Sequence, residues 1–512
     1  MSLNILLINP SLSKTDFESP LGLLYIEQAI RGAGHRVKVV DLVFEYDLEY
    51  LTAYVEANKC DVAGIYAMSP MITNAYLAAL IIKRAYPKAR TVFGGPHPTL
   101  FPKEVLQNEC VDFIVQGEGE ETIVELLRRI EEGQKVFGDI EGIAFKKHGE
   151  IVVNPRRKLI ANLDGLPFPD RGALATREGY MNLAGIKVIF GMRTLNLIAS
   201  RGCCFTCAFC QPALDIIHGG KVRFRGVNNV IAEMDDLRRN WKIQAIWFED
   251  DIFTLNRDWL MKFCQAARKS LPGIFWSCNS RLDVVDEEML LNMRQAGCLQ
   301  IRYGLESGDQ QVLDSDFKKG INLSRVGSVF EMTRSAGIKT YAYVMIGGKH
   351  ESVASVEATK RFLREVHPDH VQLAITTPMP GTRLKEEMEL DNTIIFKSRE
   401  YKDIKLFERC NFDTPNLKAA EVEELYRGIF NAVHFFKLSS PFNRKLISWI
   451  AMNLRFTAFL IFSKPKGRIQ LALRLMAADM LLVFRLAILH IPGLNKIDKL
   501  FFNKRLSFPY LA

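Results

Sequence analysis

The sequence predicts an α/β protein made of two β/α sheets in series and a helical C-terminal region. Short apolar runs alternate with amphipathic stretches over residues 1–135, and the same alternation returns over residues 193–407. Between them, the proline-punctuated stretch 162–170 makes residues 136–192 suited to an extended linker. Serial β-α units fold into parallel sheets that helices cover. We therefore expect two sheets joined by a linker, with residues 408–512 forming a helical, basic and hydrophobic region.

The first series of units predicts a doubly wound parallel sheet with helices on both faces. Its five strands are expected at 4–8, 37–40, 62–65, 91–93 and 113–115, and its helices at 21–31, 48–57, 74–85, 103–107 and 120–131. Ligands bind at the carboxyl ends of the strands in such sheets. Glycines occupy three of those ends, at Gly64, in 94–99 and in 117–120, where backbone amides can approach a large ligand closely. Turn chemistry alone explains any one of these loops.

The second series of units predicts a partial β/α barrel. Its six strands are expected at 195–200, 245–248, 274–278, 299–303, 340–346 and 370–375. The active face of a β/α barrel lies at the carboxyl ends of its strands. The residues that follow each strand are therefore the candidate site residues.

Three cysteines follow the first strand of this second series. Cys203, Cys207 and Cys210 are spaced C-x3-C-x2-C. Iron–sulfur clusters normally take four cysteine ligands, so a loop with three indicates a cluster whose remaining iron is completed by a substrate or cofactor. The alternative is a structural zinc site with His218 as fourth ligand. Zinc ligands usually come in two separated pairs, and no second pair follows in the sequence.

The cysteine loop, with the sequence SRGCCFTCAFC over residues 200–210, resembles the signature loop of the radical S-adenosylmethionine (radical SAM) enzymes. In that family three cysteines hold a [4Fe-4S] cluster, and the amino and carboxylate groups of S-adenosylmethionine bind the fourth iron. Reductive cleavage then yields a 5′-deoxyadenosyl radical. The resemblance implies that Cys203, Cys207 and Cys210 are the ligands, and that Cys204, which falls between them, is a bystander.

The same resemblance implies a site for S-adenosylmethionine along the strand ends. The segment GLESG at 304–308 is close to the family's G-x-E-S-G, and PMPGT at 378–382 matches its P-x-P-G-T turn. The turn after the fifth strand lacks the proline that relatives have there. A carboxylate after the second strand can pair with the cofactor ammonium, although an acidic helix cap that uses Asp251 is the alternative. The expected contacts are Glu249, Asp250, Asn279, Arg281, Glu306, Ser307 and Gly347.

The glycine loops of residues 1–135 together resemble the Rossmann-like cobalamin-binding domain that precedes many radical SAM cores. The likeness extends to residues 20–25 and 32–35 and to the Leu-Pro-Phe-Pro run at 166–169. The D-x-H-x-x-G motif that supplies a histidine to cobalt is absent, and we interpret His97 as a loop residue rather than a cobalt ligand. The resemblance implies cobalamin contacts from Gly94, Gly95, His97, Thr99, Gly117, Glu118, Gly119 and Glu120.

Positive charge is concentrated at the C-terminus. The chain carries +9, and residues 441–512 hold twelve Lys and Arg against two acids, which gives +10 there and leaves the rest near neutral. We predict no nucleic-acid partner. The apolar segments 446–462 and 469–491 are interrupted by charges, whereas a spanning helix needs about 20 apolar residues. They predict basic helices that lie in a membrane interface, or alternatively a helical cap on the barrel.

The cellular compartment follows from the N-terminus and the cysteines. The first residues lack a basic leader region and break at Pro10, which predicts a first strand rather than a signal peptide. The ten cysteines are too few and too unevenly placed for a disulfide framework, and an oxygen-sensitive cluster needs a reducing compartment. We predict a cytoplasmic protein, with peripheral membrane contact if the C-terminal helices lie in an interface.

The resemblance implies a cobalamin-dependent radical SAM methyltransferase. It would methylate an unactivated carbon of a hydrophobic or lipid-like small molecule, using a [4Fe-4S] cluster, S-adenosylmethionine, cobalamin and a reducing donor such as ferredoxin or flavodoxin. One alternative is an anaerobic oxidative cyclase similar to the magnesium-protoporphyrin monomethyl ester cyclases. The other is a non-catalytic iron–sulfur or zinc module.

Overall fold

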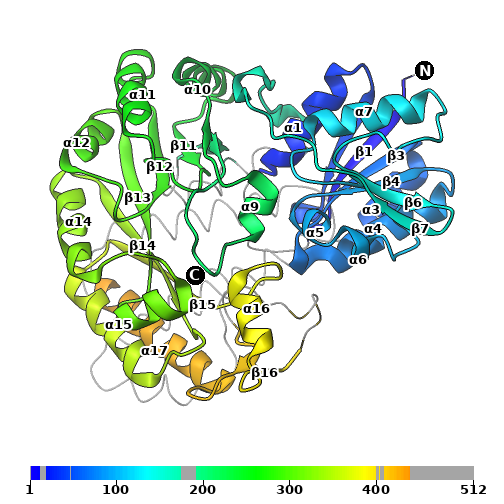
Figure 1. The fold of residues 1–512 in the computed structure, drawn as a ribbon. Coiled ribbons are helices and arrows are strands. Elements are labelled where there is room, and N and C mark those ends of the chain that lie inside the picture. The colour runs from blue at the N-terminus through cyan, green and yellow to red at the C-terminus, as the bar shows by residue number, and fades with distance from the viewer. Residues whose placement is uncertain are drawn as a thin grey trace.

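The computed structural model describes residues 2–11, 19–45, 48–174, 181, 192–398, 400, 403 and 409–438. Two large sheets organise this part of the chain, one of seven strands and one of six. Figure 1 shows them side by side, the first in blue and cyan and the second in green and yellow-green. Both sheets are covered by helices drawn from the sequence between their own strands.

The first sheet has the strand order β2-β1-β3-β4-β5-β6-β7. Its first five strands pair in parallel, whereas β6 and β7 add in antiparallel fashion. The strands are β1 (Asn4–Asn9), β2 (Arg36–Asp41), β3 (Val62–Tyr66), β4 (Arg90–Gly94), β5 (Phe113–Val115), β6 (Ile143–Lys147) and β7 (Glu150–Val153). The helices between them are α1 (Leu21–Gly32), α2 (Leu42–Glu45), α3 (Leu48–Ala57), α4 (Ile72–Ala85), α5 (Pro96–Leu100), α6 (Pro102–Val105) and α7 (Glu120–Glu131).

Helices cover both faces of this first sheet because its strands are apolar on both sides. Leu6 and Ile8 of β1 belong to a core with residues of α3 and α4, while Ile5 and Leu7 belong to a second core with residues of α1 and α7. Successive side chains of a strand point to opposite faces, so one run of apolar residues fills both layers. The predicted doubly wound sheet is confirmed.

Strands β6 and β7 lie within residues 136–192, where the sequence predicts a linker. They extend the first sheet because β6 pairs with β5 through Phe113, Ile114 and Val115. The sequence signal is weak because β7 has only four residues and none of them is buried. The proline-rich part of the segment keeps an irregular path, with short turns at Leu163–Gly165 and Arg171–Ala173.

The second sheet has the order β15-β14-β13-β12-β11-β8, and all its strands are parallel. β8 and β15 are its two edges, so it is an open barrel of six strands, as the sequence predicts. The strands are β8 (Thr194–Leu197), β11 (Ala245–Phe248), β12 (Phe275–Ser280), β13 (Cys298–Glu306), β14 (Lys339–Ile346) and β15 (His370–Ile375). The larger helices are α10 (Val227–Trp241), α11 (Arg257–Ser270), α12 (Glu287–Gln295), α14 (Leu323–Ser335), α15 (Val353–Val366), α16 (Arg383–Leu390) and α17 (Ala419–Leu438).

Helices α11, α12, α14 and α15 line one face of this sheet, which is its outer face (Figure 1). Ile246, Phe248 and Trp276 pack with them in the largest core of the protein. Residues that alternate with these point to the inner face, among them Trp247 and Arg302. The inner face is therefore rich in polar and aromatic side chains.

The remaining described elements are short. They are η1 (Ser69–Met71), β9 (Ser200–Arg201), α9 (Ala213–His218), β10 (Arg223–Phe224), α13 (Gln310–Val312), η5 (Leu313–Phe317), β16 (Ile395–Phe396) and β17 (Phe412–Asp413). The predicted apolar helices at 446–462 and 469–491 lie outside the described residues. Among the helices that are described, none combines the length and apolar character needed to cross a membrane.

Candidate functional site

The cysteine loop lies between β9 and α9, at the carboxyl end of β8. Its backbone turns through hydrogen bonds from the Cys210 and Gln211 amides to the Cys207 carbonyl, at 3.1 and 2.9 Å. The Ala208 amide donates to the Phe317 carbonyl at 2.9 Å and fastens the loop to the barrel. Gly202 has φ +95°, and a Cβ there would lie 2.8 Å from the Lys221 carbonyl oxygen. Only glycine fits the position before the first cysteine ligand.

The three thiols lie in one loop, and their role as ligands of an iron–sulfur cluster stays a prediction. Burial, with the neighbouring Cys207, raises the pKa of the Cys203 and Cys210 thiols, and a bound metal offsets that cost by holding thiolates. Zinc ligands must converge to about 2.3 Å from one ion. Within the described ranges no group of three or more His, Cys, Asp or Glu is arranged to hold a metal ion.

Two cations accompany the cysteines. Arg281 places Nη1 3.7 Å from the Cys207 sulfur, and its guanidinium lies 3.7 Å from the centre of the Phe205 ring. Lys319 is buried and interacts electrostatically with Cys207 and Cys210. Both cations favour a negatively charged group at this point. The zinc alternative, His218, lies instead beside Arg201, Arg223 and Glu118, and burial lowers its pKa to about 4.

The acidic turn after β11 holds the start of the cysteine loop. Asp250 is buried and accepts hydrogen bonds from the Ala199 amide at 3.0 Å and the Ser200 hydroxyl at 2.5 Å. Burial raises its pKa to about 7. Glu249 accepts a hydrogen bond from Asn196 at 2.6 Å. Asp250 therefore stabilises the chain that leads into the cysteine loop. The contacts of Asp250 and Glu249 with S-adenosylmethionine stay predictions.

Asp251, which the sequence offers as a helix cap, does not cap α11. Asn256 does so, since its side chain accepts a hydrogen bond from the Trp259 amide at 3.0 Å. Asp251 instead lies close enough to Cys203 and Cys210 to raise their pKa values. The sequence gives no signal for this placement beyond the three consecutive acids.

The turns after β12 and β13 converge beside the cysteines. Asn279 donates a hydrogen bond to the Asp250 carbonyl at 3.2 Å. Glu306 forms a buried ion pair with Lys319 at 2.9 Å. A Cβ at position 304 would lie 2.5 Å from Glu306 Oε1 and 2.6 Å from Lys319 Nζ, so a larger residue there would have to shift this ion pair. Ser307 shares a hydrogen bond with the Thr359 hydroxyl at 3.1 Å and supports the turn.

The turn after β14 closes without the proline of its relatives. Glu351 accepts hydrogen bonds from the amides of Gly347 and Gly348, the latter at 3.0 Å. Its carboxyl is fully buried, and burial raises its pKa to about 7. The Glu351 side chain therefore holds the turn at Gly347, which has φ +85°.

The glycine loops of the first sheet are tied to each other. Gly95 has φ +101°, and a Cβ there would lie 2.7 Å from the Tyr66 ring. The Thr99 hydroxyl donates to the Gly95 carbonyl at 2.8 Å and accepts from the Gly117 amide at 2.9 Å. His97 is buried, shares a hydrogen bond with Ser69 at 2.9 Å and has its pKa lowered to about 4 by burial. His97 is therefore a packed residue, which lies in the short helix α5 and not in the loop that the sequence predicts.

The carboxylates of the second glycine loop reach the barrel. Glu118 pairs with Arg201 at 3.1 Å and with Arg223 at 2.9 Å, and Glu120 pairs with Arg201 at 2.7 Å. Glu118 also accepts the Ile160 amide at 2.8 Å. Arg201 stands two residues before Cys203. The sequence predicts Glu118 and Glu120 as cobalamin contacts, and the structure gives both side chains arginine partners beside the cysteine loop.

The loops predicted for cobalamin and for the cluster therefore adjoin. Helix α5, which follows Gly95, packs against α9, which follows the cysteines (Figure 1). A Cβ on Gly117 would lie 3.7 Å from the Ile217 carbonyl oxygen. Arg156 spans the two by donating to the carbonyls of Ile216 at 2.7 Å and Thr99 at 3.3 Å.

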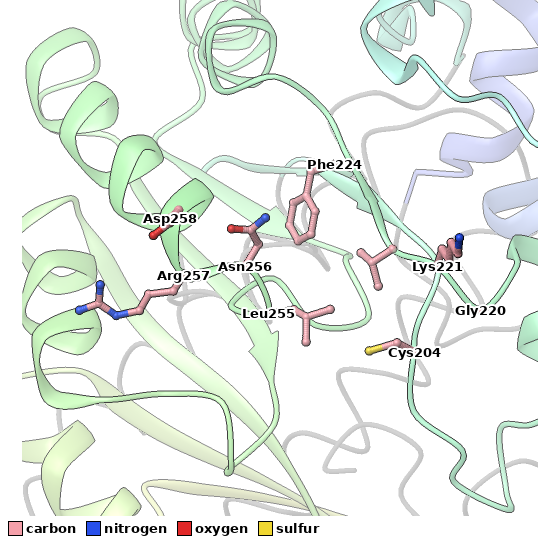
Figure 2. Close-up of a pocket in the computed structure, with 9 residues that line it drawn as sticks. Cys204, Gly220, Lys221, Phe224, Leu255, Asn256, Arg257 and Asp258 are labelled. Atoms are coloured by element: carbon pink, nitrogen blue, oxygen red, sulfur yellow. The ribbon is translucent and has the colours of Figure 1, made fainter.

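Figure 2 shows a surface pocket beside Cys204, whose sulfur points toward Leu255. Cys204 is exposed. Its interpretation as a bystander stays a prediction. The pocket is lined by Cys204, Gly220, Lys221, Val222, Phe224, Leu255, Asn256, Arg257 and Asp258.

Comparisons with known proteins agree with this arrangement. The B12 binding domain model matches residues 15–127, and the Radical SAM superfamily model matches residues 197–363. An uncharacterized methyltransferase of Pyrococcus horikoshii is 31% identical over 379 residues, a match that covers 73% of this chain and 80% of that protein. The anaerobic magnesium-protoporphyrin IX monomethyl ester cyclase of Rubrivivax gelatinosus is 27% identical over 407 residues, which cover 78% and 70% of the two chains.

A solved structure shares the fold. The radical S-adenosylmethionine methyltransferase TsrM from Kitasatospora setae, with cobalamin and a [4Fe-4S] cluster bound, superposes with a TM-score of 0.69 at 17% identity. The match covers 94% of this chain and 100% of that one. At this identity the likeness concerns the fold alone.

Proposed function

The chain belongs to the radical SAM superfamily as a member with a B12-binding domain, and we propose that it methylates an unactivated carbon of a hydrophobic small molecule. It is an enzyme whose cofactors are a [4Fe-4S] cluster, S-adenosylmethionine and cobalamin. When bound, these supply a hydrogen-abstracting radical and a methyl group, while the protein supplies position and electrostatics.

The ion pairs of Arg201 with Glu118 and Glu120, which form a bridge between the two domains, carry this proposal. Arg201 holds both Glu118 and Glu120 immediately before the cysteine loop. These side chains are at most 11% exposed, so the bridge is an interior one. A buried ionic network fixes geometry even where it adds little stability. Fixed facing loops support a reaction that uses both cofactors at one site.

The residues around the cysteines support distinct tasks. Asp250 anchors the lead-in to the loop through Ala199 and Ser200. Arg281 and Lys319 are placed to compensate the negative charge of a thiolate-held cluster. The reduction such a cluster needs supports a low-potential donor of the ferredoxin or flavodoxin kind as partner.

Oxidative cyclisation is the second candidate, because the cyclase of Rubrivivax gelatinosus is similar to this chain over 407 residues. The two reactions differ in the fate of the methyl group of S-adenosylmethionine. Transfer leaves that methyl in the product, and cyclisation does not.

The test starts from protein purified and reconstituted without oxygen. We expect corrinoid bands in the optical spectrum, 5′-deoxyadenosine on reduction in the presence of S-adenosylmethionine, and label from its methyl group in the product. Cys204→Ser serves as the matched control for Cys207→Ser. A spectrum without corrinoid bands removes the methyl-transfer mechanism, and a ring-closed product without label favours the cyclase.

A further inference from the structure

The inner face of the second sheet carries one buried arginine at its centre. Arg302 lies in the middle of β13, in register with Asn279 of β12 and Tyr341 of β14. The residue is 3% exposed. Its neighbours on the strand, Ile301 and Tyr303, belong to the outer core, so its side chain points to the inner face.

The guanidinium of Arg302 is held between aromatic rings. Its carbon lies 4.7 Å from the centre of the Trp247 ring and 4.3 Å from that of Tyr341. Nη1 donates to the Tyr343 hydroxyl at 3.2 Å. Nε is buried and has no hydrogen-bond partner. Rings orient a guanidinium by cation–π attraction, but they do not neutralise its charge.

Arg302 differs in this from the other buried cations of the barrel. Arg281 pairs with Asp283 at 2.8 Å, Lys319 with Glu306 at 2.9 Å, and Arg225 with Glu233 at 2.6 Å. Over the described ranges no carboxylate pairs with Arg302, which meets only Tyr343 and the two rings. A buried charge without a counter-ion is unfavourable. An anionic ligand beside Arg302 would remove this cost by supplying the missing counter-ion.

Arg302 comes before the cluster end of the barrel along β13. Glu306 lies four residues further along β13, and a strand rises about 3.3 Å per residue. The backbone of Arg302 is thus at most roughly 13 Å from that of Glu306, because the strand is irregular between Gly304 and Glu306. The Tyr343 hydroxyl, which accepts from Arg302 at 3.2 Å, donates to Asn279 at 3.5 Å and so links Arg302 to a predicted contact of S-adenosylmethionine.

We infer that Arg302 binds an anionic group of the substrate, a carboxylate or a phosphate, on the inner face of the barrel. This inference rests on the proposed function and narrows its substrate class to hydrophobic acids. The planar guanidinium matches two oxygens of such a group at once. Tyr343 offers a hydroxyl at the same place, while Trp247 and Tyr341 form the apolar walls.

The test measures binding to anaerobically reconstituted holoenzyme by isothermal titration calorimetry. The probes are 4-phenylbutyrate, phenyl phosphate and the neutral 4-phenylbutyramide. We expect the wild type to bind at least one of the acids ten or more times more tightly than the amide, and the stronger acid identifies the group. Arg302→Met should lose this preference without weakening the amide. Arg302→Lys should keep part of the preference for the acid, because lysine keeps the positive charge but lacks the planar guanidinium that binds two oxygens at once.

Arg257→Met is the matched control, because Arg257 is exposed and pairs with Glu288 at the start of α11. Thermal melts, the cluster and corrinoid absorbance and the affinity for S-adenosylmethionine report that each variant is folded and loaded. Equal binding of acids and amide by the wild type overturns the inference, as does wild-type acid affinity in Arg302→Met or no saturable binding of either acid. If Arg302→Met does not fold, Arg302→Lys decides, and unchanged acid affinity in it overturns the inference.

Failure of this inference is distinguishable from failure of the proposed function. Acid binding is measured without turnover, whereas the proposed function depends on corrinoid bands and methyl label in the product. If the protein shows corrinoid bands and methyl label in the product but no preference for acids, only the inference about Arg302 is wrong. Acid preference in a protein that binds no corrinoid removes only methyl transfer.

Discussion

The two sheets differ in how many of their faces form a core with helices of the described part of the chain. The first sheet is packed on both faces, by α3 and α4 on one and by α1 and α7 on the other. The second sheet has its large helical core on one face, and its inner face carries Trp247, Arg302 and Tyr341. A sheet buried on both sides offers only its strand ends to a ligand. The inner face of the second sheet instead carries charged and aromatic side chains, among them Arg302 and Trp247.

The two domains also differ in the groups that they present to a ligand. The first domain presents the backbone loops that carry Gly95 and Gly117, tied by the neutral hydroxyl of Thr99. The second presents charged side chains, of which Glu351 and Asp250 are buried carboxyls with raised pKa values. We expect the second region to respond to charge, pH and cluster loss, and the first to respond little.

The largest effect should come from removing a cluster ligand. Cys207→Ser replaces a buried thiol of the cysteine loop, and we expect it to abolish the broad cluster absorbance and 5′-deoxyadenosine formation. Corrinoid binding should persist, since the loops of the first sheet do not contain this residue. Optical spectra and product assays measure both. Loss of corrinoid along with the cluster would contradict the separation of the two regions, and Cys204→Ser should resemble the wild type.

Breaking the bridge between the regions should have the next largest effect. Arg201→Met leaves Glu120 buried without its cation, and uncompensated buried charge costs about 3–5 kcal/mol. Urea denaturation should show that loss in the unfolding free energy. Arg257→Met, which removes exposed ion pairs, should change it by about 0–1 kcal/mol. Equal losses in the two variants would mean that the bridge does not join the domains.

Glu351 should give the second region a pH dependence. Burial raises its pKa from 4.5 to about 7, so the folded state binds more protons than the unfolded state between these values, and stability falls as pH rises through that window. Each pKa unit corresponds to about 1.4 kcal/mol, which sets an upper limit of about 3 kcal/mol.

The matched variant for this prediction is Glu351→Gln, which keeps an acceptor for the Gly347 and Gly348 amides. We expect the difference in unfolding free energy between this variant and the wild type to shift in favour of the variant from pH 5 to pH 8. A difference that is the same at both values would show that Glu351 does not titrate in this range.

The smallest effect should come from the hydroxyl that ties the glycine loops. Thr99→Val removes the hydrogen bonds to Gly95 and Gly117 and keeps the side-chain shape. We expect a loss of about 0.5–1.5 kcal/mol for each net hydrogen bond, with no change between pH 5 and pH 8. Corrinoid affinity, titrated by absorbance, should weaken as Gly117 loses its support. Unchanged affinity would place the corrinoid contact elsewhere.

Much of the fold and part of the site were predictable from the sequence. The β-α alternation gave both sheets, because apolar periodicity is a local property that backbone hydrogen bonding converts into strands and helices. The spacing of Cys203, Cys207 and Cys210 and the glycine at position 202 are local in the same sense. Strands β6 and β7 were not predicted, because their short sequences are partly exposed and carry little periodicity.

The tertiary structure alone decided which charges meet. Nothing local joins Glu118 to Arg201, which are 83 residues apart, or Glu306 to Lys319. It also decided that Arg302 has aromatic rings beside it and, among the residues that the structure describes, no paired carboxylate. The physical reason is that strand formation depends on neighbours in sequence, whereas the environment of a charge depends on every segment packed around it. The sequence by itself determined two sheets and a thiol loop, and the packing determined how the charges around them are paired.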